Sequence, residues 1–103
     1  SLEILRSGLK CSDGDKAARD VITEAGYGEF FRHSTGHGVG IEIHEKPNLS
    51  PKSVTTLRTG NIVTVEPGIY ILGKFGVRIE DMALITENGC RNLTNAAKEL
   101  VIL

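Results

Sequence analysis

Two runs of residues that favour β structure flank a glycine-containing turn, and this pattern restricts the chain to a fold with antiparallel strands. The first run, residues 61–66, is rich in β-branched side chains and resumes after Pro67-Gly68 as Ile69-Tyr70-Ile71. The second predicts one long strand over residues 77–85. Residues 73–76, Gly-Lys-Phe-Gly, predict the turn between the two runs, and Asn88-Gly89 predicts a further hairpin turn.

The N-terminal quarter predicts one main helix over about residues 13–26. Ser12 is a candidate cap, and Gly26 and Gly28 are helix-ending residues. The apolar residues of this stretch fall on one helical face: Ala17, Ala18, Val21, Ile22 and Ala25. We interpret the acidic residues there (Asp13, Asp15 and Asp20) as capping or solvated groups rather than metal ligands. The predicted fold class is therefore α+β, with strand-rich structure over residues 37–103.

All three histidines lie within twelve positions: His33, His37 and His44. Residues 41–44 alternate between apolar and polar and predict a strand, whereas residues 46–51, with two prolines, predict a loop. His37 and His44 have opposite parity, so a flat strand would place them on opposite faces. A bend near residues 38–40 is needed to bring both to one site, and the glycines there permit it.

Glu66 and Glu80 are the same number of residues before and after Gly73 in the sequence. A regular hairpin that turns at Gly73 therefore places the two carboxylates opposite each other. Two like charges there repel, unless one is protonated or a cation lies between them. Arg78 shares a strand face with Glu80 and is expected to orient it, while Asp81 points the other way. The alternative is a pair of glutamates on a solvated face, but the residues around them are too apolar for a freely exposed ribbon.

One of these histidines, together with Glu66 and Glu80, would give three candidate metal ligands. Nitrogen and oxygen ligands without thiolate suit Mn²⁺, Co²⁺, Zn²⁺ or Fe²⁺. The sequence alone does not choose among these ions.

Length and charge exclude several classes. With 103 residues and a formal net charge of -1, the chain is one domain at most, and nothing in the charge favours nucleic acid or an anionic membrane as a partner. No apolar run is long enough to span a membrane, and no signal peptide is recognisable, so a cytoplasmic location is expected. Ser1 is not expected to be the natural start. Cys11 and Cys90 are expected to be reduced thiols.

Three separated motifs together resemble the creatinase/aminopeptidase family, peptidase M24, whose catalytic domain has the pita-bread fold. The motifs are residues 36–45 (Gly-His-Gly-Val-Gly-Ile-Glu-Ile-His-Glu), residues 64–70 (Thr-Val-Glu-Pro-Gly-Ile-Tyr) and residues 77–81 (Val-Arg-Ile-Glu-Asp). They resemble most closely the Xaa-Pro branch, the prolidases and aminopeptidases P. The resemblance covers about residue 10 to the end and implies hydrolysis of Xaa-Pro peptide bonds with two divalent ions, Mn²⁺ favoured over Co²⁺ or Zn²⁺.

The resemblance also implies a role for each site residue. His37 matches the histidine ligand, Glu66 a terminal carboxylate ligand that also shuttles a proton, and Glu80 the carboxylate that bridges two ions. His33 and His44 match histidines that contact the substrate and the developing oxyanion. Arg78 matches an arginine that holds the bridging carboxylate.

Two further aspartate ligands of the family, which precede the histidine motif, have no match here. The chain is therefore expected to be the C-terminal half of the catalytic domain and to be inactive alone. Unpaired sheet edges favour association with another copy, so a homo-oligomer that binds a proline-containing peptide is expected.

Three other interpretations remain open at this stage. A methionine aminopeptidase shares the Gly-His-Gly motif, but the sequence Glu-Pro-Gly-Ile-Tyr at residues 66–70 and the short Glu66–Glu80 spacing favour the Xaa-Pro branch. A non-catalytic module that binds peptides or proteins is a second alternative, although the ligand residues are present. A small β-rich protein without a site would leave the clustering of His, Glu and Arg unexplained.

Overall fold

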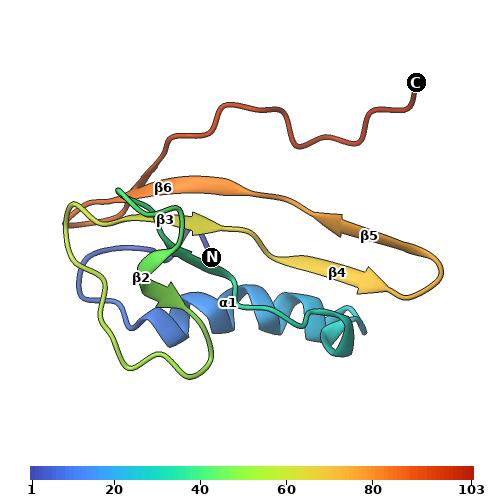
Figure 1. The fold of residues 1–103 in the computed structure, drawn as a ribbon, viewed down its shortest axis with the longest axis horizontal. Helices are drawn as coiled ribbons and strands as arrows, with labels where there is room; N and C mark the ends of the chain where they lie inside the picture. The colour runs from blue at the N-terminus through green and yellow to red at the C-terminus, as the bar shows by residue number, and fades with distance from the viewer.

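The computed structural model describes residues 1–103 as one helix, a five-stranded antiparallel sheet and a two-stranded ribbon (Figure 1). The elements in chain order are α1 (Cys11–Glu24), the 3₁₀ turn η1 (Gly28–Phe30), β1 (Gly36–Gly38), β2 (Glu45–Leu49), β3 (Ile62–Val65), β4 (Gly68–Ile71), β5 (Phe75–Arg78), β6 (Asp81–Ile85) and β7 (Cys90–Asn92). The larger sheet has the strand order β2-β1-β3-β6-β7, and β4 pairs with β5. The predicted α+β class is confirmed.

One hairpin register runs through both sheets. Val65 pairs with Asp81 at the end of the larger sheet, and Gly68 pairs with Arg78 at the start of the ribbon. The two pairs lie three positions apart on both strands, so the register does not slip across Pro67. The long strand predicted over residues 77–85 is therefore two strands, β5 and β6, interrupted at Ile79-Glu80. The interruption is caused by Pro67 on the opposite strand, because proline has no N–H to donate to the ladder.

The hairpin turns where the sequence predicted. Ile71 pairs with Phe75, the Lys74 N–H donates to the Ile71 carbonyl at 3.0 Å, and Gly73 has a φ of 75°. A positive φ is strained for other residues, which explains glycine at this position. The second predicted turn is also present, since β6 and β7 pair through Ile85 and Cys90 on either side of Asn88-Gly89.

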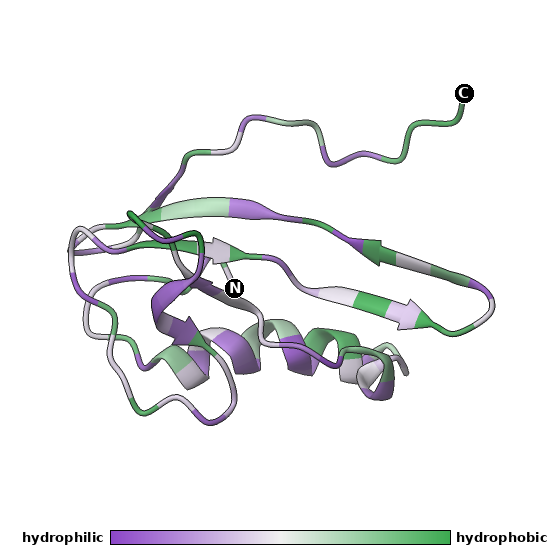
Figure 2. Ribbon diagram, in the orientation of Figure 1, coloured by the Kyte–Doolittle hydropathy of each residue, from purple (hydrophilic) through white to green (hydrophobic).

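Alternation along β3 and β6 separates a core face from a second face. Val63, Val65, Ala83 and Ile85 are buried and form one cluster with Leu5, Cys11, Leu49 and Leu57. Figure 2 shows α1 along one side of the hairpin, which is its core side. Burial raises the pKa of the Cys11 thiol, and burial likewise raises the pKa of Cys90. Cys11 and Cys90 form no disulfide bond with each other.

The predicted helix is correct in existence but shifted by two residues. It begins at Cys11 after the cap residue Lys10, so Ser12 lies inside the first turn and is not the cap. Its end is a Schellman motif: Gly26, at a φ of 91°, donates to the Thr23 carbonyl, and Tyr27 donates to the Ile22 carbonyl. The prediction of Gly26 as a helix-ending residue is confirmed.

The interpretation of the helical acidic residues is partly wrong. Asp13 and Asp20 are exposed, but Asp15 is buried and lies with Cys11, Gly14 and Ala18 on the buried face of α1. The predicted apolar face, by contrast, lies mostly along a groove beside the hairpin, where Val21 remains 66% exposed. The two faces are adjacent on the helix. The buried face was not predicted because it contains Gly14 and the paired Asp15, which a pattern of apolar side chains does not include.

Two predictions between residues 41 and 51 are wrong. Residues 41–44 form a bent loop rather than a strand, and Ile41 and Ile43 are exposed despite their alternation. Lys46, Pro47 and Asn48, predicted as loop, belong to β2. Pro47 is tolerated because β2 is an edge strand of the sheet.

The residues after β7 contain no helix or strand. Figure 2 shows hydrophobic residues at the end of this tail, and Leu100, Val101, Ile102 and Leu103 are all exposed. No helix of the chain is long and apolar enough to cross a membrane.

Gly36 allows β1 to approach β3 closely, and its substitution tests this contact. A Cβ at Gly36 would lie 1.7 Å from the Thr64 carbonyl oxygen, so Gly36→Ala requires a backbone shift. We expect it to lower the free energy of unfolding by about 1–3 kcal/mol, measured by denaturant titration. Gly89→Ala is the control, because a Cβ there meets nothing nearer than 4.0 Å. Equal stability of the two variants would contradict the close approach.

Candidate active site

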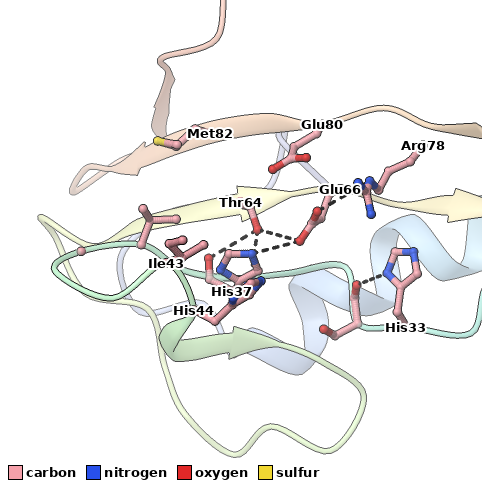
Figure 3. A pocket seen from close by; sticks show the side chains of 12 residues that line it. His33, His37, Ile43, His44, Thr64, Glu66, Arg78, Glu80 and Met82 are labelled. Carbon is pink, nitrogen blue, oxygen red and sulfur yellow. Dashed lines mark hydrogen bonds and ion pairs between the residues drawn. The ribbon is translucent and has the colours of Figure 1, made fainter.

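A cleft of about 640 Å³ on the face of the hairpin opposite the core contains every site residue proposed from the sequence. These are His33, His37, His44, Glu66, Arg78 and Glu80. The other lining residues are Ser34, Val39, Gly40, Ile43, Thr64 and Met82. Figure 3 shows that the side chains come from β3, from the β5–β6 strand and from the segment around β1.

The cleft depends on strand parity. Thr64, Glu66, Arg78, Glu80 and Met82 occupy even positions and face the cleft. Asp81 lies on the other face, as predicted, beside α1. Because the register does not slip, Glu66 falls directly opposite Glu80, and Figure 3 shows both carboxylates on the cleft side. Glu66 is half-buried and Glu80 is exposed.

His37 and Glu66 form the closest polar contact of the cleft. The Nε2 atom of His37 lies 3.1 Å from Oε1 of Glu66, with the side chains 14% and 15% exposed. The Nδ1 atom lies 2.9 Å from the Gly38 carbonyl, which only accepts, so Nδ1 carries the proton. In a neutral ring Nε2 is therefore an acceptor that faces an acceptor. A proton on either atom, or a metal ion, is needed between the two atoms.

Arg78 contacts a different carboxylate from the one expected. Its Nε lies 3.9 Å from Oε2 of Glu66, and it makes no ion pair with Glu80. Arg78 pairs with Gly68 in the ribbon, which makes Glu66 its diagonal neighbour across the strands and places it within reach of a long side chain. The expectation that Arg78 holds Glu80 is therefore not met in this structure.

His44 reaches the cleft because the chain bends after β1. Residues 39–44 form this bend, and the His44 ring lies 4.2 Å from the His37 ring, centroid to centroid. The bend required by the opposite parity of the two histidines is thus present.

His33 sits at the other end of the cleft and is held by its own contacts. Its Nδ1 donates to the Ser34 carbonyl at 2.8 Å, so its Nε2 accepts the hydroxyl proton of Tyr70 at 3.0 Å. The ring also packs edge-on against Phe31 at 5.2 Å. These contacts fix the orientation of the ring.

Thr64 links the two central residues and was missed in the sequence. Its buried hydroxyl accepts a hydrogen bond from the backbone N–H of His37 at 3.0 Å and donates toward Oε1 of Glu66 at 3.3 Å. Its position two residues before Glu66 on a strand was the available signal, since residues i and i+2 share a face. Asp15 and Arg19 were missed in the same way, although an acid and a base four residues apart on a helix predict a pair.

The side chains present fit part of a divalent metal site. His37 Nε2 and both carboxylates offer the nitrogen and oxygen donors that such ions take, and Nδ1 of His37 is held by a carbonyl, as is usual for a histidine ligand. Within this chain, however, no three His, Cys, Asp or Glu side chains lie close enough together to hold an ion. The exposed Glu80 lines the cleft without joining the His37–Glu66 contact.

The family model of metallopeptidase family M24 matches residues 1–87. The chain therefore belongs to metallopeptidase family M24. Membership implies divalent metal ions, and the arrangement of one helix with antiparallel sheets matches part of the family's pita-bread fold.

Individual relatives are similar over nearly the whole chain. An Xaa-Pro dipeptidase of Pyrococcus horikoshii is 50% identical over 98% of this chain, and an uncharacterised peptidase of Bacillus subtilis, YqhT, is 52% identical over 96%. Among solved structures, an Xaa-Pro dipeptidase from Bacillus anthracis matches with a TM-score of 0.97, 53% identity and 99% coverage. The prolidase from Pyrococcus furiosus matches with a TM-score of 0.92, 49% identity and 94% coverage. The chain spans 28–29% of the length of these four proteins.

Replacement of Thr64 tests its linking role. Thr64→Val keeps the shape of the side chain but leaves the backbone N–H of His37 without an acceptor. We therefore expect the free energy of unfolding to fall by about 1–3 kcal/mol. Thr64→Ser keeps the hydroxyl and should lose less. Denaturant titration of both variants measures the difference, and a serine variant as unstable as the valine variant would show that the hydroxyl bond contributes nothing.

Proposed function

We propose that the protein containing this chain is a metal-dependent Xaa-Pro peptidase, a prolidase or Xaa-Pro aminopeptidase, and that this chain carries part of its active site. The observation that carries the proposal is the group of facing acceptors: His37 Nε2 lies 3.1 Å from Glu66 Oε1, and Glu80 stands opposite Glu66 across the hairpin. Such a group favours a cation between its members. The Xaa-Pro dipeptidases at about 50% identity support the choice of substrate.

In this proposal His37, Glu66 and Glu80 hold the divalent ions. Bound there, the ions would polarise the scissile carbonyl and stabilise negative charge on its oxygen. Glu66 also moves a proton, because its carboxylate lies at the centre of the cleft and already accepts from Thr64. Arg78, 3.9 Å away, keeps positive charge beside that carboxylate.

The two remaining histidines bind the substrate. His44 lies beside His37 at the mouth of the bend, and His33 lies at the opposite end with its ring fixed by Tyr70. The His44 imidazole can donate a hydrogen bond to the developing oxyanion, and the His33 imidazole can reach the peptide when its Nε2 exchanges the Tyr70 hydroxyl for the substrate. The proposed catalytic set is therefore His33, His44, Arg78 and Glu66.

The finer features of the proposal are Mn²⁺ as the preferred ion, a cytoplasmic location and a homo-oligomeric state. The free thiols of Cys11 and Cys90 support a reducing compartment. Exposed apolar side chains along the ribbon, including Leu72, Phe75 and Val77, support contact with another protein surface.

The proposal assigns the remaining ligands to other parts of the protein. This chain brings only His37 and Glu66 into contact and spans 28–29% of the relatives described above. We therefore propose that the 103-residue chain is inactive alone and that the full-length product of its gene is active.

Hydrolysis of peptides tests the substrate class. The full-length protein with Mn²⁺ should cleave an Xaa-Pro dipeptide and leave a Met-Ala peptide intact, measured by release of free amino acids, and the 103-residue chain should cleave neither. Preferential cleavage of Met-Ala would favour a methionine aminopeptidase. Absence of cleavage of both peptides by the full-length protein would favour a non-catalytic binding module.

Removal of one carboxylate tests the assigned roles. Glu66→Gln in the full-length protein keeps the shape but removes the negative charge of a ligand and a proton acceptor, so we expect kcat to fall by at least about 10²-fold. Glu87→Gln, an exposed position outside the cleft, is the control and should leave kcat unchanged. Wild-type kcat in Glu66→Gln would contradict the role of Glu66.

A further inference from the structure

The buried face of α1 carries an ion pair that lies outside the cleft. Asp15 is 1% exposed, and its carboxylate accepts from Arg19 twice, at 2.8 Å from Nε and 3.0 Å from Nη2. This two-pronged geometry is specific to the planar guanidinium. A buried pair of this kind is weak evidence for stability, because the cost of removing both charges from water offsets their attraction. Its other contacts are therefore more informative.

Arg19 uses its remaining donors on the segment that leads into the cleft. Nη1 donates to the Phe31 carbonyl at 2.8 Å, and Nη2 donates to the His33 carbonyl at 2.8 Å. The guanidinium also lies over the Phe31 ring, 4.1 Å from its centroid. Phe31 in turn packs edge-on against the His33 ring. Arg19 thus contacts both the backbone of His33 and the ring on which the imidazole rests.

Asp15 holds the next part of the same segment. Its Oδ1 accepts from both the N–H of Thr35, at 3.0 Å, and the Thr35 hydroxyl, at 2.9 Å. The Thr35 carbonyl then accepts the N–H of Glu66 at 2.6 Å. A single side chain of the helix is therefore two hydrogen bonds away from the backbone of the central carboxylate residue.

We propose that Asp15 and Arg19 form a positioning pair that fixes residues 31–35 and thereby sets the place of the His33 ring and the backbone of Glu66 in the cleft. The catalytic consequence rests on the proposed function, whereas the geometric consequence does not. Neither residue lines the cleft, so they act through His33 and Thr35 and not on a substrate.

The test exchanges cationic groups at two positions of the same helix in the full-length protein. Arg19→Lys keeps the charge beside Asp15, but an ammonium cannot reproduce the planar set of donations to Asp15 and to both carbonyls. Lys16→Arg is the matched control, since Lys16 pairs with Asp20 four residues away on the exposed face of α1. Both variants leave the net charge unchanged.

The first readout is the His33 ring in metal-free, histidine-labelled protein, with its NMR signals identified by their loss in His33→Asn. We expect the ring signals to shift in Arg19→Lys and to stay in place in Lys16→Arg. The second readout is kcat and KM for an Xaa-Pro dipeptide with Mn²⁺. Here we expect kcat to fall between about tenfold and a hundredfold in Arg19→Lys, because small displacements of positioned groups have effects of this size.

A purely structural role gives a different result. If Arg19→Lys lowers only the unfolding temperature and leaves the His33 signals and kcat at wild-type values, the proposal is overturned. If the wild-type protein cleaves no Xaa-Pro dipeptide, the proposed function fails, and the NMR signals still decide the positioning role.

A second pair of variants covers the case in which Arg19→Lys does not fold. Thr35→Val removes the hydroxyl that donates a hydrogen bond to Asp15, and Thr35→Ser keeps this hydroxyl. The proposal expects shifted His33 signals and reduced kcat in the valine variant, with both restored toward wild type by serine. Identical signals in the two variants would overturn it.

Discussion

The continuous register of the hairpin around Gly73 is the constraint on which the rest of the cleft depends. The same register joins the Val65–Asp81 pair to the Gly68–Arg78 pair, although Pro67 between them has no N–H to donate. A slip of one residue in either strand would turn that strand's glutamate to the core side, so that Glu66 and Glu80 would no longer share the cleft face. The positive φ of Gly73 and the hydrogen bond that closes the turn fix the point from which this register is counted.

The register places like charges where they need a partner of opposite charge. Glu66 faces Glu80 on one side and the acceptor nitrogen of His37 on another. Arg78 is the nearest cation, but at 3.9 Å and on a half-exposed side chain it offsets only part of this repulsion. The arrangement is thus costly for a purely structural cluster and suited to binding a metal ion, which agrees with membership of a metallopeptidase family.

Local sequence predicted the parts of the structure that depend on periodicity and on turn chemistry. The helix, its Gly26 end, the two hairpin turns and the opposition of Glu66 and Glu80 all follow from spacing within one element or one hairpin. The failures occur where tertiary contacts decide. Alternation at residues 41–44 predicted a strand, but the bend after β1 leaves Ile41 and Ile43 in solvent. Pro47 lies in a strand because that strand is at an edge.

The candidate site shows the same division. Strand parity and the resemblance to a family identified the six proposed residues, and the structure brings all six to one cleft. The partner of Arg78 was not predictable, because it depends on which diagonal neighbour the side chain reaches. Asp15 was interpreted as a capping or solvated group, and its burial depends on Arg19 and on Thr35, which lies twenty positions away.

Anomalous X-ray diffraction from crystals of the full-length protein grown with Mn²⁺ tests the central claim most directly. The account predicts anomalous peaks in the cleft within coordination distance of His37 Nε2 and of carboxylate oxygens of Glu66 and Glu80, with other ligands supplied from elsewhere in the protein. Peaks that avoid these three side chains, or a cleft without any peak at saturating Mn²⁺, would contradict it.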